Sequence, residues 1–462
     1  MTCWKSQKTK VHSLKEYQTI SKITGPLIIA EGIKDVGYRE LVKVMLKDGT
    51  ERTGQVLELK DDIAVIEVFE GTAGIDTKET KIRFLGKGFT IGVSKDMVGG
   101  IFDGLGRPKN MKLIPEKRTD INGMPINPYS REVPKEFIET GFSAIDGLLS
   151  LIRGQKLPIF SESGIPHNKL AAKIAQNIKS DLVVFAAIGV TNDELRYFIS
   201  EFEKTGALEN IIVFANIASD PVIERIITPR AALTAAEYFA WEHNKNVVVI
   251  LSDMTNYANA LREISASKEE VPSRRGYPPY LYSDLASIYE RTGRIKGKGG
   301  SITQIPILTM PEGDITHPIP DLTGYITEGQ IMLSPAFHRT GIFPPINIIP
   351  SLSRMMHHGI GLHFTREDHR QLSNQIYTFY SKGKKLEQLK SIIGEDALSE
   401  LDKKYLGFAS SLENKFIGQT KKRNVKETLN LGWNLLKILP KEELTKIDKD
   451  IIEKYWYDTY DE

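Results

Sequence analysis

Cysteine is almost absent from this 462-residue chain, which contains only Cys3. A single cysteine excludes an internal disulfide and fits a reducing compartment. Long apolar runs are missing as well. The longest, Leu182 to Val190, has nine residues, far fewer than the ~20 that a membrane-spanning helix needs. We therefore expect any association with a membrane to be indirect.

The chain also lacks net charge of either sign, with 61 basic and 59 acidic side chains. Without a large basic field, nucleic-acid binding is not expected. Residues Met1 to Val11 are polar and Lys-rich and have no apolar core, which argues against a signal peptide. We expect residues 1–12 to form a disordered extension. The length predicts roughly three globular domains.

The most informative absence is that of a working phosphate-binding loop. From Phe160 to Asn168 the chain reads Phe-Ser-Glu-Ser-Gly-Ile-Pro-His-Asn, between an apolar strand pattern and an amphipathic helix pattern. A Walker A loop needs Gly-rich backbone, a Lys for the β- and γ-phosphates and a Ser/Thr hydroxyl for Mg²⁺. Here the Lys position is Pro166, the hydroxyl position is His167 and the first Gly position is Phe160. Residues of this degenerate loop that remain candidates for weak nucleotide contact are Ser161, Gly164, Pro166, His167 and Asn168.

The pattern along the chain predicts three structural parts. Residues 13–84 have short strand patterns, including a hairpin from Gly54–Leu59 to Ile63–Phe69, and predict a small β-barrel. Residues 85–356 alternate buried-type strands with helices, which predicts a parallel α/β domain like those of P-loop NTPases. Residues 357–462 have helical apolar spacing and predict a helical bundle. The expected strands are Leu182–Ile188, Ile211–Ile217, Val247–Leu251 and Ile302–Leu308, and the expected helices are Asp193–Lys204, Ile223–Glu242 and Asn256–Ser267.

Two strand ends bear on catalysis. The apolar strand before Asp253 has the form of a Walker B element, whose Asp would hold Mg²⁺ through water. An Asp in this place is equally typical of a helix N-cap, and the sequence leaves both interpretations open. At the end of another strand, Val190 follows Gly189, where a hydrolytic site would have a Glu to polarise the attacking water. This second loss argues against catalysis by this chain.

The most specific segment covers residues 344–354, Pro-Pro-Ile-Asn-Ile-Ile-Pro-Ser-Leu-Ser-Arg. Pro-x-Ile-Asn, three residues and then Ser-x-Ser form the signature of the ring subunits of rotary ATP synthases and ATPases. Arg354 follows the signature directly. A proline-stiffened loop with a surface-paired Arg is the plainer alternative, and the length of the match favours the signature.

With this signature the chain resembles the B subunit of V-type/A-type rotary ATPases, the non-catalytic subunit of their soluble head. The similarity extends from about Tyr17 to Ile447. Other motifs that carry it are Phe69–Thr72, Phe102–Pro108, Phe160–His167, Leu251–Tyr257, Gly276–Pro278, Pro320–Gln330 and Thr365–His369. The altered phosphate loop is part of the resemblance, because the F-type non-catalytic subunit keeps its Walker Lys and Thr.

The resemblance implies an alternating ring of three B and three catalytic A subunits, with central-stalk and peripheral-stalk partners. Arg354 would be an arginine finger for the ATP site of the adjacent A subunit, with Ser351 and Ser353 at the same interface. ATP or ADP with Mg²⁺ would be held mainly by the A subunit, and Asp253 would contribute weakly. The complex would couple ATP synthesis or hydrolysis to H⁺ or Na⁺ transport, peripherally at the cytoplasmic face of a membrane. The chain alone would be inactive.

Two alternatives of other classes stay open. An active ring ATPase would need an intact Gly-x4-Gly-Lys-Thr loop and a Glu after Gly189, and neither is present. A structural ring spacer would have no role in chemistry. Separately, His357, His358, His363 and His369 form a cluster that could be a metal site or a pH-sensitive hinge. We expect a solvated linker there, since no Cys or carboxylate set completes a ligand pattern.

Overall fold

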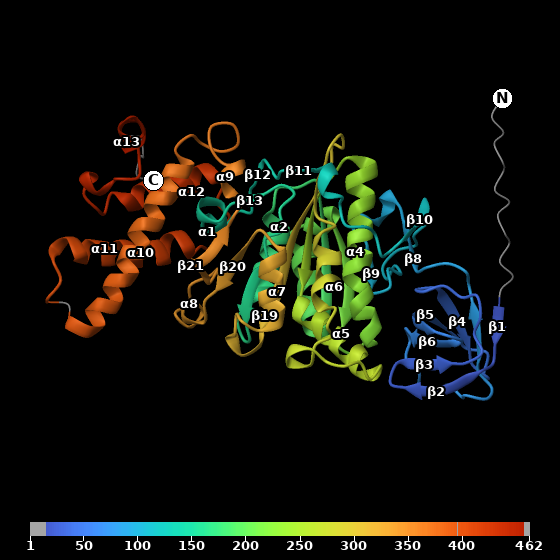
Figure 1. The fold of residues 1–462 in the computed structure, drawn as a ribbon. Coiled ribbons are helices and arrows are strands. Elements are labelled where there is room, and N and C mark those ends of the chain that lie inside the picture. The colour runs from blue at the N-terminus through green and yellow to red at the C-terminus, as the bar shows by residue number, and fades with distance from the viewer. Residues whose placement is uncertain (1–14, 395, 457–462) are drawn as a thin grey trace, which may run out of the picture.

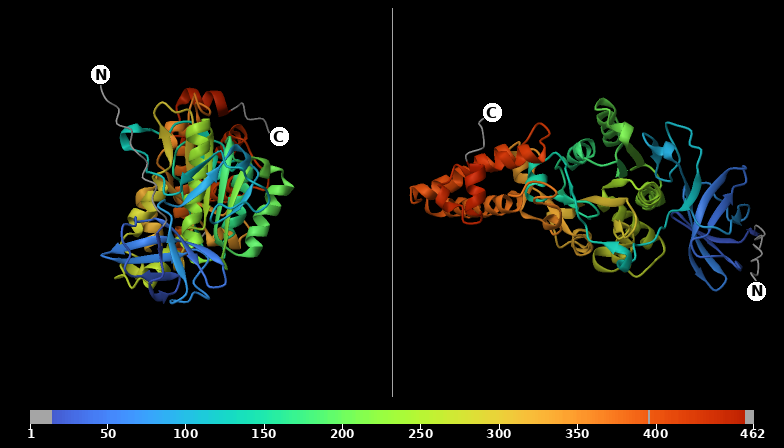
Figure 2. Two further views of the ribbon diagram at one scale, coloured as in Figure 1. Left: turned by 90° about the vertical axis from the view of Figure 1, so that its right-hand side faces the viewer. Right: turned by 90° about the horizontal axis from the view of Figure 1, so that it is seen from above.

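Three parts lie in a row in the computed structural model, with a strand-rich part at one end and a helical part at the other (Figures 1 and 2). The structure describes residues 15–394 and 396–456. The expected extension at residues 1–12 lies outside them. Among the described helices, none combines the length and the apolar character that a membrane span requires.

The N-terminal part is a seven-stranded antiparallel sheet with the order β1-β7-β4-β5-β6-β3-β2. Its strands are β1 Lys15–Tyr17, β2 Ile20–Thr24, β3 Leu27–Ala30, β4 Leu41–Met45, β5 Glu51–Lys60, β6 Ile63–Val68 and β7 Lys81–Phe84. The predicted hairpin is confirmed as β5 and β6, joined by a turn in which Asp61 has a φ of 53°. Val42, Val44 and Ile66 are fully buried, so alternate side chains of the strands fill the interior.

One carboxylate of this sheet is buried on the other face, toward the α/β domain. Glu67 on β6 is 1% exposed, and neither carboxylate oxygen has a hydrogen-bond partner among the described residues. Burial without a partner penalises the charged form and raises the pKa of Glu67 to about 8. Glu67 is therefore mostly protonated at neutral pH.

Replacing Glu67 with Gln is expected to stabilise the protein in alkaline solution and to change little in acid. The unfolded chain releases this proton near the ordinary value of 4.5, and the native chain retains it until about pH 8. Stability is therefore lost as pH rises between these values, by up to ~5 kcal/mol. Chemical denaturation at about pH 5 and about pH 8.5 measures the effect. Exposed Glu58→Gln is the control, and parallel pH curves for wild type and Glu67→Gln would contradict the prediction.

The central part is an α/β domain built on one large sheet with the main order β21-β20-β14-β19-β17-β15-β16-β9. Its inner strands are parallel, and β21 is antiparallel to β20 at the edge. The strands of this path are β9 Ile101–Asp103, β14 Ile159–Glu162, β15 Leu182–Val190, β16 Ile211–Ile217, β17 Asn246–Ser252, β19 Ser301–Met310, β20 Gly329–Leu333 and β21 Ile346–Ser353. The peripheral strands are β8 Thr90–Val93, β10 Lys117–Asp120, β11 Arg131–Glu132, β12 Phe137–Ile138, β13 Leu151–Ile152 and β18 Gly293–Ile295.

Helices cover both faces of this sheet, as predicted. They are α1 Ser143–Leu148, α2 His167–Asn177, α3 Asn192–Lys204, α4 Val222–His243, α5 Met254–Ser267, α6 Leu281–Tyr289, α7 Pro318–Ile326, α8 Pro335–Arg339 and α9 Met356–Gly359. Strand β15 shows why the faces form: Val183 and Phe185 enter the core beside α2 and α3, whereas Val184 and Ala186 enter the core beside α4 and α5. A nine-residue apolar run thus serves both faces, as expected of a buried parallel strand.

The C-terminal part consists of helices, as predicted. They are α10 His369–Ile393, α11 Glu400–Ser411, α12 Val425–Leu436 and α13 Lys449–Trp456, and a π-helical segment, Leu412–Ile417, continues α11. Trp433 is fully buried, and its indole N–H donates to Asp368 Oδ2 at 2.6 Å. The same apolar core includes Phe198 of the α/β domain. The two parts are therefore packed together.

The histidine cluster divides into two environments. His357, His358 and His363 are exposed. The expectation of a solvated linker is wrong for His369, which is fully buried, with Nε2 3.1 Å from the carbonyl oxygen of Gly147. Desolvation lowers the pKa of His369 to about 4. Within the described chain, no three His, Cys, Asp or Glu side chains are placed to hold a metal ion.

Candidate functional site

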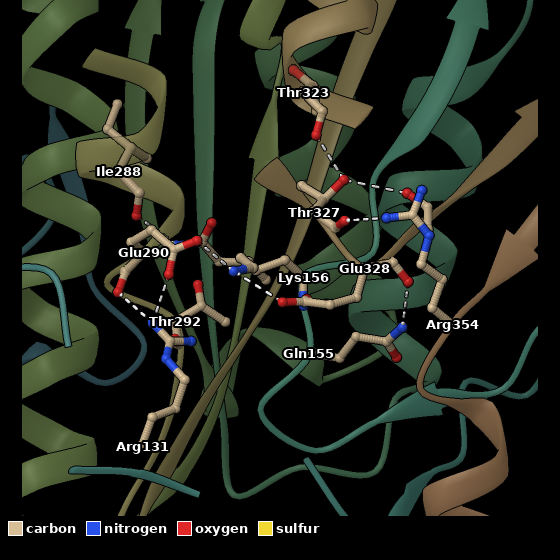
Figure 3. A network of polar contacts seen from close by, with 12 residues as sticks. Arg131, Gln155, Lys156, Ile288, Glu290, Thr292, Thr323, Thr327, Glu328 and Arg354 are labelled. Atoms are coloured by element: carbon tan, nitrogen blue, oxygen red, sulfur yellow. Dashed lines mark hydrogen bonds and ion pairs between the residues drawn. The ribbon is translucent and has the colours of Figure 1, made fainter. Parts of the chain in front are cut away.

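Arg354 follows β21 directly and lies at the edge of the large sheet (Figure 3). Its backbone N–H donates to the carbonyl oxygen of Glu328 at 3.0 Å. Its Nη1 donates to the carbonyl oxygen of Thr327 at 3.3 Å, and the side chain is exposed. No ion pair involves Arg354 in the described part of the chain. Hydrogen bonds thus hold the backbone of Arg354 and one guanidinium nitrogen, while the side chain is exposed to solvent.

A buried lysine supports this arrangement. Lys156 is 3% exposed and lies between two carboxylates, with Nζ 2.8 Å from Glu290 Oε1 and 2.9 Å from Glu328 Oε1. Its backbone N–H donates to Glu328 Oε2 at 2.7 Å. Gln155 adds a bond from Nε2 to the carbonyl oxygen of Glu328 at 3.1 Å. Glu328, the residue that holds the backbone of Arg354, is therefore fixed by both Lys156 and Gln155 (Figure 3).

The network continues from Lys156 through Glu290 to Arg131. Its Nη2 lies 2.7 Å from Glu290 Oε2, and its Nη1 donates to the carbonyl oxygen of Thr292 at 2.7 Å. Arg131 and Lys156 balance the two carboxylates of Glu290 and Glu328. The positive charge of Arg354 therefore has no compensating acid in this network, so it is available to an anion from outside.

The two serines of the signature point into the fold. Ser351 and Ser353 are each 7% exposed. Ser351 Oγ accepts from the backbone N–H of Met332 at 2.9 Å. Ser353 Oγ donates to the carbonyl oxygen of Ser150 at 2.9 Å and accepts from Gln155 Nε2 at 3.0 Å. Both hydroxyls tie β21 to its neighbours and so shape the strand that presents Arg354.

The degenerate loop connects β14 to α2, as the sequence predicts. Helix α2 starts after Pro166 without a side-chain cap. Ser161 is fully buried, and Gly164 has a φ of 84°. Asn168 Nδ2 donates to Glu194 Oε1 at 2.7 Å. His167 Nδ1 is buried without a hydrogen-bond partner among the described residues. The strand–loop–helix geometry is thus present without the groups that hold phosphate and metal.

Asp253 caps helix α5. Its Oδ1 accepts from the backbone N–H of Thr255 at 2.7 Å, and its Oδ2 accepts from the hydroxyl of Thr309 at 2.6 Å. Burial raises the pKa of the Asp253 carboxyl. The N-cap interpretation is therefore confirmed, and the Walker-B-like role of Asp253 stays a prediction.

The predicted site residues lie at two opposite ends of the sheet. The loop and Asp253 follow the carboxyl ends of parallel strands β14 and β17. Ser353 pairs with Gly329, at the amino end of β20, and β20 runs parallel to β14 with Ile331 opposite Ile159. Arg354 is therefore level with Lys156, six residues before the end of β14 at Glu162, which at ~3.3 Å per residue is about 20 Å along the strands. Arg354 thus lies far from the loop of its own chain.

A cavity of about 820 Å³ lies beside α2, between the α/β domain and the helical part. Six basic side chains line it, and no carboxylate is among its described lining residues. The basic residues are Lys169, Lys173, Lys415, Lys421, Lys422 and Arg423. None of the loop residues 160–168 lines the cavity, so its positive charge comes from α2 and from the helical part.

Sequence reasoning did not assign a role to Lys156, Glu290 or Arg131. Their positions along the chain are far apart, and no motif joins them. Glu328 stood inside a recognised motif, Pro320–Gln330, but its carboxylate was not singled out. The only available signal was a Lys just before a buried strand, where an unpaired charge would be costly.

Three family models match the chain. Residues 20–86 match the beta-barrel domain of the ATP synthase alpha/beta family, and residues 141–353 match its nucleotide-binding domain. Residues 358–456 match the C-terminal domain of V and A type ATP synthase. Among solved structures, the ATP synthase subunit NeqB from Nanoarcheaum equitans is 42% identical with a TM-score of 0.73, over 89% of this chain and 98% of that one. The chain therefore belongs to the ATP synthase alpha/beta family and is a subunit of its V/A type, as the motifs predict.

Proposed function

We propose that this chain is the non-catalytic B subunit of a V/A-type rotary ATP synthase or ATPase. It alternates with catalytic A subunits in a hexameric ring and contributes Arg354 to the ATP site of the adjacent A subunit. Central-stalk and peripheral-stalk subunits are its further partners. The complex couples ATP turnover to H⁺ or Na⁺ transport in a separate membrane sector, and this chain works peripherally at the cytoplasmic face.

The observation that carries the proposal is the environment of Arg354. Its guanidinium is exposed and has no ion pair in the described chain, while its backbone is fixed by Glu328. Fixed positive charge directed at developing charge on transferred phosphate stabilises the transition state. Because Arg354 lies at the sheet end opposite its own loop, a nucleotide that it contacts would belong to another subunit. Supply from a neighbour also makes turnover depend on closure of the interface.

The degenerate loop supports a non-catalytic role. Pro166 and His167 replace the Lys and hydroxyl of a working loop, Val190 replaces the polarising Glu, and Asp253 is bonded to Thr255 and Thr309. ATP or ADP with Mg²⁺ would therefore be held mainly by the A subunit. Tight nucleotide binding by this chain is not part of the proposal.

The purified chain alone is expected to release phosphate from ATP no faster than a control without protein. The reason is that it lacks a Lys on the β/γ-phosphates, a hydroxyl for Mg²⁺ and a base for water. Phosphate release with Mg-ATP measures this, and the A–B complex at equal concentration is the positive control. Steady turnover by the chain alone would favour an active ring ATPase.

A structural spacer without a role in chemistry remains the second candidate. Turnover of a reconstituted A–B ring that contains Arg354→Ala separates it from the arginine-finger proposal. Retained turnover supports the spacer, and its loss in an intact ring supports the finger.

A further inference from the structure

A second cavity lies away from Arg354, between the barrel and the α/β domain. Its volume is about 590 Å³, within the range of roughly 300–1,000 Å³ typical of small-molecule sites. Strands β5 and β6 of the barrel form one wall, and helices α4, α5 and α6 form the other. Nothing in the proposed function uses this space.

Glu67 lines the cavity and is the charged group without a partner there. At 1% exposure, its two oxygens have no hydrogen bond with residues 15–394 or 396–456 and almost no direct contact with bulk water. A buried acceptor that remains unsatisfied costs free energy, more so when it is charged. The position therefore favours a ligand that brings a donor, and above all a cationic donor.

The other ionisable groups around Glu67 are engaged with one another or with solvent. From the core helices, Arg230 Nη2 lies 2.7 Å from Asp284 Oδ1. After α5, Lys268 Nζ lies 2.8 Å from Glu270 Oε1. The remaining groups are Arg39, which donates to Asn122 at 2.7 Å, Tyr280, whose pKa burial raises, and the exposed side chains of Tyr38 and Glu58. None of these contacts satisfies Glu67, although the charge of Lys268 favours its ionised form.

Beside these charged groups, the facing wall has an apolar part. Ile223 and Ile227 of α4 and Leu261 and Ile264 of α5 are buried side chains that line it. A ligand that fits both walls has a cationic head for Glu67 and an apolar body for the helices. We propose that this cavity binds a small organic amine whose ammonium group pairs with the Glu67 carboxylate.

Binding of the amine is expected to release the Glu67 proton to solvent. Free Glu67 is mostly protonated at neutral pH, since burial raises its pKa to about 8. A bound ammonium stabilises the ionised form, so the carboxyl releases its proton to solvent and an ion pair forms. At pH 7 about 0.9 proton is released per ligand. Affinity rises about tenfold per pH unit up to pH 8 and then levels off.

Isothermal titration calorimetry of the full chain with phenethylammonium tests the proposal, and 2-phenylethanol is the neutral comparison. At about pH 7.5 the amine is expected to bind with Kd of about 1 mM or below, and the alcohol at least tenfold more weakly. Glu67→Gln, which keeps the size and removes the charge, is expected to weaken amine binding at least tenfold. Glu58→Gln removes an exposed carboxylate of the same cavity and is expected to change Kd less than twofold.

Proton release is measured by repeating the titration in two buffers of different ionisation enthalpy. At pH 7 wild type is expected to release about 0.9 proton, and Glu67→Gln none. The proposal is overturned if wild type binds no amine, if alcohol and amine bind equally, or if Glu67→Gln retains affinity and proton release. Because Arg354 takes no part, these outcomes are independent of ATP turnover in the A–B complex.

Discussion

Arg354→Ala is expected to lower ATP turnover of the reconstituted A–B complex by about 10³-fold or more, the range observed when arginine fingers are removed. The physical reason is that the exposed guanidinium is the uncompensated charge of its network, while Lys156, Arg131 and two carboxylates balance one another. Removing the guanidinium takes away positive charge that would stabilise the transition state at the ATP site of the A subunit. Steady-state hydrolysis, with ring assembly checked by size and mass, measures the loss.

Two further variants make this result specific. Arg354→Lys keeps the charge but loses the planar fork that meets two oxygens at once, so an intermediate turnover is expected. Arg196, an exposed arginine on α3, provides the matched control Arg196→Ala, which should retain turnover. Near wild-type activity of an intact Arg354→Ala ring would reject the finger and leave the spacer.

Lys156→Met is expected to cause the largest loss of stability, about 3–5 kcal/mol, because it removes the buried cation between Glu290 and Glu328 and leaves Arg131 to pair with Glu290 alone. Glu328 would keep its contacts with Gln155 and with the backbone of residue 156 but would lose its ion pair, so we expect it to hold the backbone of Arg354 less firmly. We expect turnover of the assembled ring to fall as well, although Arg354 itself is unchanged. Chemical denaturation of the chain and hydrolysis by the ring measure the two effects separately.

Lys47→Met is the matched control for this prediction. Lys47 also forms an ion pair, with Nζ 2.7 Å from Glu79 Oε2, but the side chains are 75% and 45% exposed. Solvent screens such pairs, so little change in the free energy of unfolding is expected. A Lys156→Met variant as stable and as active as wild type would contradict the view that the Lys156–Glu328 ion pair helps to position Arg354.

Local patterns were sufficient for most of the architecture. The alternation of Gly54–Leu59 and Ile63–Phe69 predicted β5 and β6, since a two-residue period places side chains on opposite faces. The nine apolar residues from Leu182 predicted β15, because a strand covered on both faces has no polar side. Helical spacing around Trp433 predicted the C-terminal bundle. Each of these features depends on residues close together in the chain.

The candidate site was only partly predictable. The signature before Arg354 and the missing phosphate-loop Lys are visible in consecutive residues. The fate of His369 was not, since exposure depends on what packs over a side chain, and Gly147 is more than 200 positions away. For the same reason the sequence did not predict that Asp253 accepts a hydrogen bond from Thr309, 56 positions away.

The sequence by itself determined which chemical groups this protein has, and therefore that its loop has neither the Lys nor the hydroxyl of a Walker A element. It also determined the order of strands and helices, because periodicity is a local property. Only the tertiary structure decided which charges are compensated. Folding pairs Lys156 with the distant Glu328, whereas it buries Glu67 without a hydrogen-bond partner among the described residues. The electrostatic consequence differs because the energy of a charge depends on distances in space, not on separation along the chain.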